Sequence, residues 1–349
     1  MLNVSFIVPV YNSEKDLPRL LSSLTGQQGD YSFEILLIDD GSTDRSFEVC
    51  RRFADEDSRI RVFHQENAGP SAARNKGLDM AGGEYILFCD ADDYIETDSL
   101  QQLLSLPHHD LVFFSLYDEM WDAQHLLSSS AWKVESRAYS STAALLNDFH
   151  YLLLHNLLYS QCTKLYCREI IEANHLRFET GISMGEDISF NLEYFAYVQS
   201  AYILNACLYH YVHVTRSQSI SSGYYPGYYD NVCMVMQREK QLLSRFNVLT
   251  EENEEALQRY FLGRVSSAVQ NDFARPKCHL RGKYRSVRTI FSSHPAQEAA
   301  RCGHPTRHLY KILAFCIRHR WYLAGTFLFL AVSFTKLRLP RLVGRIKGE

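Results

Sequence analysis

Three aspartates, Asp90, Asp92 and Asp93, directly follow the apolar run YILFC. Such a cluster is costly unless a positive charge lies against it. Asp90 and Asp92 are one residue apart at a strand end, so their side chains point to the same side and can share a ligand. Mg²⁺ or Mn²⁺ usually binds through one or two carboxylates plus substrate phosphates. The pair therefore predicts a cation with a nucleotide diphosphate, whereas Asp93 could simply cap a helix.

The elements that position these acids follow an alternating pattern. Apolar runs of strand length alternate with helix-sized segments that have polar faces, which is typical of an α/β fold with a mostly parallel sheet. Ligands of such sheets sit at the carboxyl ends of the strands. The predicted strands are residues 3–10, 33–40, 60–65, 85–92 and 110–116, and the predicted helices are residues 14–26, 44–56, 70–81 and 97–106.

Polar side chains come where three of these strands end. They are Pro9, Tyr11 and Asn12 after the first strand, Asp39 and Asp40 at the end of the second, and Asp90 and Asp92 at the end of the fourth. The sequence therefore places the candidate ligands at one edge of the sheet.

The pattern changes after about residue 118. We expect helices at 141–158, within 162–178, and from Glu186 or Asp187 onward, where acidic side chains suit the helix dipole. A short strand at 201–214 and a helical C-terminal extension are expected next. In that extension, which begins near residue 228, one helix face carries Leu257, Phe261 and Val265.

The last part of the chain is strongly basic. Residues 301–349 hold ten Lys or Arg and one acid, for a net charge of +9, whereas residues 1–300 carry −13. The fifteen uncharged residues 321–335 would span roughly 22 Å as a helix, against about 30 Å for a bilayer core. This length is short for a transmembrane span, and the aromatic residues and flanking cations predict a segment lying in the membrane interface on anionic lipid. The alternative is an ordinary core helix with a solvated basic end.

Composition excludes several classes of protein. Nine scattered cysteines, an odd number without a CxxC pair, indicate neither a disulfide framework nor a zinc site and favour a reducing cytosol. The N-terminal stretch has no basic start and no cleavage site, so nothing in it directs export. Nucleic acid is not an expected partner, because the body is acidic and the basic tail is interleaved with aliphatic residues.

Three stretches, FIVPVYN, ILLIDDGSTD and QENAGPSAARNKGLDMAGGEYILFCDADD, resemble the family 2 glycosyltransferases in order and spacing. The resemblance covers about residues 3–220 and implies the GT-A fold and transfer of a sugar from a nucleotide donor, usually a UDP-sugar. We expect a nucleotide-sugar-binding half (1–118) and an acceptor-side half (119–222), followed by a helical extension (223–306) and the basic tail (307–349).

The resemblance also implies a role for individual residues. Asp90 would contact the ribose, and Asp92 would hold the metal that bridges the diphosphate. For Asp40 the alternative is a turn residue, and Asp44 could cap the next helix. The implied nucleoside contacts are Pro9 and Tyr11 as a wall for the uracil, Asp40 as an acceptor of a hydrogen bond from the base, and Asn67 and Arg74.

The stretch GEDISF corresponds to an acidic pair of the family. The resemblance implies Asp187 as the general base with Glu186 beside it, and a neighbouring like charge would raise the pKa of either acid. The alternative is that both only stabilise a helix start. One displacement would invert the sugar configuration. In a later segment His210, His213, Arg216 and Ser219 could close over the diphosphate, or each histidine could be a core or surface residue.

The expected reaction is transfer of a single sugar to a lipid-linked or polysaccharide acceptor at the inner face of the plasma membrane. A Gln-x-x-Arg-Trp signature of processive synthases is missing. One competing hypothesis is a sugar nucleotidyltransferase, although FIVPVYNSEKDL offers no glycine for a phosphate loop. The other is a glycan-binding or nucleotide-sugar-binding protein without catalysis.

Overall fold

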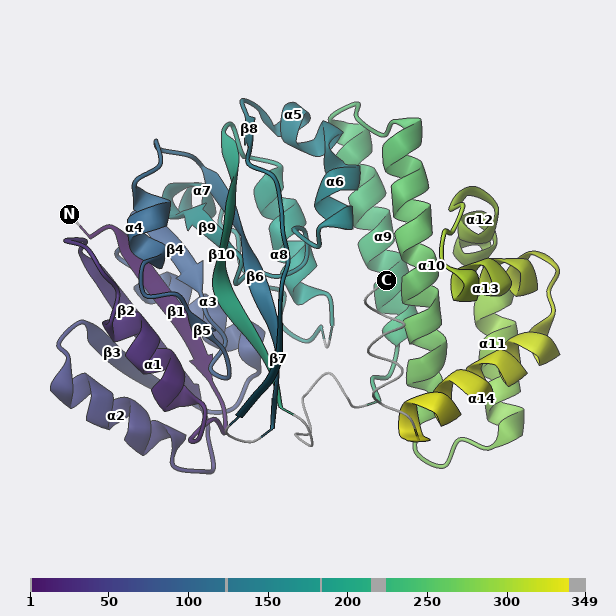
Figure 1. Ribbon diagram of the computed structural model, residues 1–349, viewed down its shortest axis with the longest axis horizontal. Coiled ribbons are helices and arrows are strands. Elements are labelled where there is room, and N and C mark those ends of the chain that lie inside the picture. Colours follow the sequence, from purple (N-terminus) through teal and green to yellow (C-terminus); the bar gives the residue numbers. More distant parts are fainter. Residues whose placement is uncertain (1, 123–124, 183, 215–223, 339–349) are drawn as a thin grey trace. The chain divides into compact units, whose positions relative to one another are not determined.

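The computed structural model describes residues 2–122, 125–182, 184–214 and 224–338 (Figure 1). The chain divides into two compact units. Unit 1 comprises Met1–Ile182 and Glu186–Ser217, and unit 2 comprises Ser183–Gly185 and Gln218–Glu349.

Unit 1 is built on one sheet with strand order β3-β2-β1-β4-β9-β6-β10-β5, and β7 and β8 pair with β6 and β10. Strands β1 and β2 are buried along nearly their whole length. Continuous apolar strands of this kind are covered on both faces of the sheet. The strands are β1 (Val4–Val10), β2 (Phe33–Asp40), β3 (Ile60–Gln65), β4 (Tyr85–Phe88), β5 (Tyr94–Ile95), β6 (Leu111–Asp122), β7 (His125–Ala131), β8 (Arg137–Tyr139), β9 (Lys164–Cys167) and β10 (Ala201–Val214).

The sheet contains the predicted parallel strands together with antiparallel ones. Strands β1, β2, β3 and β4 pair in parallel with one another, as predicted. Strand β9 then enters between β4 and β6 and is antiparallel to both. Its four residues, KLYC, lie in a segment for which only a helix was expected. Strand β10 is 14 residues long rather than short, and most of its length runs parallel to β6.

The parallel register brings the strand ends together. Val10 pairs with Asp39, Asp40 pairs with Gln65, and Ile7 pairs with Phe88. The residues that follow β1, β2, β3 and β4 therefore emerge at one edge. The helices between these strands begin and end within three residues of the predicted bounds, and they are α1 (Leu17–Thr25), α2 (Ser46–Glu56), α3 (Pro70–Met80) and α4 (Ser99–Leu104).

The remaining helices of unit 1 agree with the sequence in part. The predicted helix at 141–158 is divided at Asp148, which ends one helix and starts the next. The helix expected at Glu186 begins there. These helices are α5 (Thr142–Asn147), α6 (Phe149–Leu154), α7 (Arg168–Ala173) and α8 (Glu186–Phe195).

Unit 2 is helical in its described part, as expected. Leu257, Phe261 and Val265 are buried, as their spacing predicts. A second buried feature is the ion pair between Arg264 and Glu239, whose nitrogen and oxygen atoms lie 3.0 Å apart. The helices are α9 (Tyr228–Arg245), α10 (Glu251–Ala274), α11 (Leu280–Ser292), α12 (His294–Cys302), α13 (His308–Arg318) and α14 (Tyr322–Arg338). Among the described residues, every helix is too short or too polar to cross a bilayer.

Helix α3 approaches β1 closely through a glycine. A Cβ atom added to Gly77 would lie 2.3 Å from Cγ2 of Ile7, whereas one added to Gly263 in α10 would meet the Tyr310 hydroxyl at an ordinary 3.7 Å. Gly263 is therefore a control position for a substitution at Gly77.

We predict that Gly77→Ala lowers the free energy of unfolding of unit 1 by about 1–3 kcal/mol, because α3 must move away from the sheet. Gly263→Ala should raise the stability of unit 2 by roughly 0.5–1 kcal/mol through its helix propensity. Chemical denaturation of each variant measures both effects. Equal effects of the two substitutions would contradict the close approach at Gly77.

Candidate active site

Polar contacts fasten together the loops at the carboxyl edge of the sheet. The side-chain oxygen of Asn12, after β1, accepts a hydrogen bond from the backbone amide of Thr43, after β2, at 2.8 Å. The carboxylate of Asp40 accepts from the backbone amides of Ala68 at 2.9 Å and Gly69 at 2.8 Å, in the loop after β3. These bonds hold the three loops in one arrangement.

Asp40 is 2% exposed and is a structural centre of this edge. Besides the two amides, it accepts from the Gln65 side chain at 2.7 Å. Its neighbour Gly41 has φ of 71°, and a Cβ atom there would lie 2.8 Å from the backbone nitrogen of Asn67. Asp40 therefore positions the Asn67 loop, a role that the resemblance did not supply.

The other residues predicted to contact the nucleoside lie at the same edge. The side chain of Tyr11 is 45% exposed and Asn67 is also exposed, while Pro9 is half-buried at the end of β1. An exposed aromatic ring beside the loops that Asp40 and Asn12 hold is suited to packing against a planar base.

A buried guanidinium is the partner of the aspartate cluster. Arg74 of α3 is 5% exposed. Its Nη2 lies 3.0 Å from Oδ1 of Asp90, in the turn after β4, and its Nη1 lies 3.1 Å from Oδ1 of Asp187, at the start of α8. Glu186 lies at the outer limit of an ion pair, 3.9 Å from the same Nη1. One cation thus brings together two acidic motifs that are far apart in the sequence.

Gln161 completes this network. With its amide oriented to satisfy its neighbours, its nitrogen donates to Asp187 at 2.8 Å and its oxygen accepts from Arg74 at 2.8 Å. Neighbouring Asn75 exchanges hydrogen bonds of 2.7 and 2.8 Å with the backbone of Phe178, whose ring lies under the Arg74 guanidinium. The Asp187 carboxylate is therefore held from two sides.

Burial sets the protonation of Asp187. Its pKa is raised to about 7: partial loss of water around the carboxyl is the largest cause, the like charges of Glu186 and Asp90 add to the shift, and Arg74 opposes it. The sequence predicted a raised pKa from a like charge, and the larger cause is burial. A carboxyl with this pKa can both hold and release a proton near neutrality.

Lys164 of β9 is a further ionisable group near Asp187. It is fully buried, and burial lowers its pKa to about 7, while the nearby Asp187 opposes the shift. Its ammonium group donates to the carbonyl of Ser160, next to Gln161. Lys164 therefore helps to hold the segment that carries Gln161.

The pair Asp90 and Asp92 is the predicted site of a hard cation. Burial and the charge of Asp90 raise the pKa of Asp92 to about 6, a tension that a bound cation relieves. Among the described residues, no group of three or more His, Cys, Asp or Glu is arranged to hold a metal ion. A cation at this pair would therefore need further oxygen ligands from a bound phosphate or water, as Mg²⁺ usually does.

Asp93 is not a helix cap. Its buried carboxylate accepts from the hydroxyl of Tyr209 at 2.7 Å and from the backbone amide of Val212 at 2.8 Å. The Tyr209 oxygen in turn accepts from the backbone amide of Asp90 at 3.1 Å. Asp93 thus attaches the aspartate turn to β10.

The histidines of β10 have protein partners. His210 is buried, with its ring nitrogens 3.0 Å from Glu96 and 2.9 Å from Glu119, and its ring stacks on that of Tyr94 at 4.0 Å. His213 lies 3.2 Å from Asp118. These contacts favour the alternative of structural residues. The other two predicted residues, Arg216 and Ser219, lie outside the described residues.

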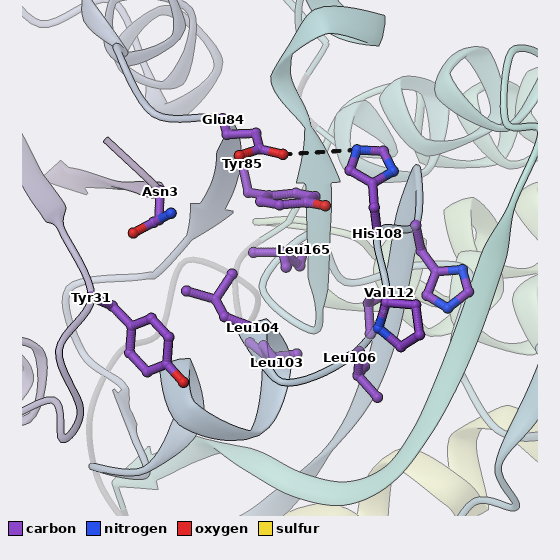
Figure 2. Close-up of a pocket in the computed structure, with 12 residues that line it drawn as sticks. Asn3, Tyr31, Glu84, Tyr85, Leu103, Leu104, Leu106, His108, Val112 and Leu165 are labelled. Carbon is purple, nitrogen blue, oxygen red and sulfur yellow. Dashed lines mark ion pairs between the residues drawn. The ribbon is translucent and has the colours of Figure 1, made fainter. Parts of the chain in front are cut away.

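A cavity of about 240 Å³ lies at a different place in unit 1 (Figure 2). It is lined by residues at the amino ends of strands, including Asn3 before β1 and Glu84 before β4, and Glu84 lies 3.9 Å from His108. Strand ends of this kind face away from the aspartate turn. This cavity is therefore separate from the candidate active site.

Comparisons with known proteins show the family of the chain. The family model described as glycosyl transferase family 2 matches residues 5–173. EpsH of Bacillus subtilis (strain 168), named as a glycosyltransferase, is 32% identical over 260 residues, which cover 72% of each protein. EpsJ of the same organism, also named as a glycosyltransferase, is 33% identical over 211 residues, and this chain spans only 60% of its length.

A solved structure resembles the whole fold. The crystal structure of S. aureus TarS 1–349 in complex with UDP-GlcNAc matches with a TM-score of 0.66 at 21% sequence identity, covering 95% of this chain and 92% of that one. The fold is thus a GT-A fold followed by a helical region. The chain belongs to the family 2 glycosyltransferases.

We predict that Arg74→Met lowers the free energy of unfolding by roughly 3 kcal/mol, the lower end of the cost of breaking a buried ion pair, because Asp90 and Asp187 are about one third exposed. The control is Arg177→Met, which removes surface ion pairs to Asp79 and Glu172 and should lose less than about 1 kcal/mol. Chemical denaturation measures both values. A loss no larger than that of the control would contradict the central role of Arg74.

Proposed function

We propose that this protein transfers a single sugar from a UDP-sugar to a hydroxyl group of a lipid-linked or polysaccharide acceptor, with inversion. The observation that carries the proposal is the bridge through Arg74, which holds Asp90 and Asp187 at one edge of the sheet. The TarS complex with UDP-GlcNAc supports a UDP-sugar donor, since the two chains share a fold. Nine free cysteines favour a reducing compartment, and we place the reaction at the inner face of the plasma membrane.

Asp187 is the general base of the proposed reaction. Its carboxylate takes the proton of the acceptor hydroxyl as that oxygen bonds to the anomeric carbon, and the bond from this carbon to the UDP oxygen breaks. Hydrogen bonds from Arg74 and Gln161 fix the orientation of the carboxylate. Because the reaction is one displacement, an α-linked donor gives a β-linked product.

Donor binding is assigned to the first 118 residues. Tyr11 and Pro9 pack against the uracil, Asn67 contacts the nucleoside, and Asp40 holds the Asn67 loop in place. Asp90 and Asp92 would hold Mg²⁺ or Mn²⁺ together with the donor diphosphate. Such an ion acts as a Lewis acid and stabilises charge on the departing diphosphate. Residues 119–222, which include Asp187 and Glu186, are assigned to the acceptor side.

A panel of nucleotide sugars tests the proposal. The purified chain is incubated with each donor and with a mixture of glycan and lipid-linked acceptors, in Mn²⁺ or in a chelator, and released UDP is measured. We expect release from one or a few UDP-sugars that is lost in the chelator. Turnover only with nucleoside triphosphates would indicate a nucleotidyltransferase. Donor binding without UDP release would indicate a binding protein.

Substitution of the proposed base separates binding from chemistry. Asp187→Asn should leave donor affinity within about twofold and lower the transfer rate by about 10²–10⁴-fold, because the amide cannot accept the proton. Asp79→Asn, which changes an exposed carboxylate of α3, is the matched control and should keep full activity. Calorimetric donor titration and UDP release give the two quantities. Unchanged transfer by Asp187→Asn would exclude this residue as the base.

The pKa of Asp187 predicts a pH dependence. A base must be ionised to act, and burial raises the pKa of this carboxyl to about 7. The rate at saturating substrate should therefore fall as pH decreases through about 7, approaching tenfold per pH unit below it. A pH–rate profile between pH 5.5 and 8.5 measures this effect. A flat profile would contradict an essential base with a raised pKa.

A further inference from the structure

Helix α14 has apolar residues on both of its faces. One face is buried in unit 2: Phe329 is 1% exposed and Thr326 is 3% exposed, and the core next to them is formed by Val287, Ile290 and other residues of α10 to α13. The opposite face carries Leu323 and Phe327, which are 65% and 64% exposed. A helix that is apolar all round is normally covered on every side. We therefore expect an apolar partner to cover the outer face of α14.

Helix α13 also has exposed apolar residues. Ile312 and Phe315 lie one turn apart on the outer face of α13 and are 51% and 44% exposed. The ring of Phe315 meets that of Trp321, just before α14, edge to face at a centroid distance of 5.1 Å. We call these exposed residues together the apolar face, and they are Ile312, Phe315, Trp321, Leu323 and Phe327.

Exposed cations neighbour this face along the chain. Lys311, Arg318 and Arg320, on α13 and in the turn after it, are exposed. Residues 277–335 contain ten Lys or Arg and a single acid, Glu298. That acid already lies 2.9 Å from the ammonium group of Lys240. The segment that carries the apolar face is therefore almost entirely positive in charge.

We infer that the apolar face lies on the surface of an anionic lipid membrane. Aliphatic and aromatic side chains enter the interface between head groups and acyl chains, and the neighbouring cations meet lipid phosphates. With 17 residues, α14 is roughly 26 Å long and has one side packed on protein, so the helix lies along the membrane. This docking would bring the protein to a lipid-linked acceptor. The exposed apolar residues and the cations support membrane docking whether or not the protein transfers a sugar.

Vesicle flotation of the full chain tests the inference. Vesicles of phosphatidylcholine alone are compared with vesicles that contain phosphatidylglycerol. We expect binding to the anionic vesicles, with a loss of at least about tenfold in the double variant Leu323→Gln, Phe327→Gln, since both side chains leave water on docking. Leu154→Gln is the control, because Leu154 of α6 in unit 1 is 73% exposed and should not contact lipid.

A charge variant examines the lipid phosphates separately. Arg318→Gln, Arg320→Gln should lower binding to anionic vesicles severalfold, and 0.5 M salt should have a similar effect on the native chain. Circular dichroism verifies that each variant is folded. Anionic vesicle binding that both double variants retain in full would overturn the inference. So would a native chain that stays off vesicles and self-associates through Leu323 and Phe327, seen as a dimer that the apolar double variant abolishes.

Discussion

The position of the Arg74 guanidinium constrains the rest of unit 1. A guanidinium that is nearly removed from water must have carboxylate partners, because its charge cannot be lost. The Arg74 guanidinium pairs with Asp90 in the turn after β4 and with Asp187 at the start of α8. Helix α3, which carries this residue, is seated on β1 through Gly77, and the loop before it is held by Asp40. The donor edge of the sheet and the proposed base are therefore parts of one electrostatic assembly.

The same assembly accounts for the acid–base properties of the site. Burial favours the protonated form of Asp187, and the ion pair with Arg74 favours the ionised form. The Glu186 and Asp90 charges weaken the effect of the guanidinium. These opposing influences leave the pKa of the carboxyl near neutral pH, where a general base is most effective. A base of this kind needs no special residue type, only an intermediate degree of burial and one shared cation.

Much of this could be read from the sequence, and the missing parts have physical causes. The strand ends that carry Tyr11, Asp40 and Asp90 were predictable, because each follows an apolar run in a repeating pattern. Strand β9 was not predictable, because four residues are too few to show the alternation of a strand. Its partners β4 and β6 are also distant in sequence. Gln161 and Lys164 were missed for the same reason: neither belongs to a motif, and only the sheet order places them beside Asp187. The structural role of Asp93 depends on β10, more than a hundred residues later.

The late entry of β9 has a consequence for how the protein is made. Strands β4 and β6 are separated in the sheet by a strand that is synthesised after both of them, and β10 follows later still. A ribosome that has completed only the first 160 residues therefore exposes a nascent sheet with two unpaired edges in its middle. Long-range pairings of this type form slowly, and open strand edges invite association with other chains. The edges of β4 and β6 therefore stay unpaired until the segment with β9 has emerged.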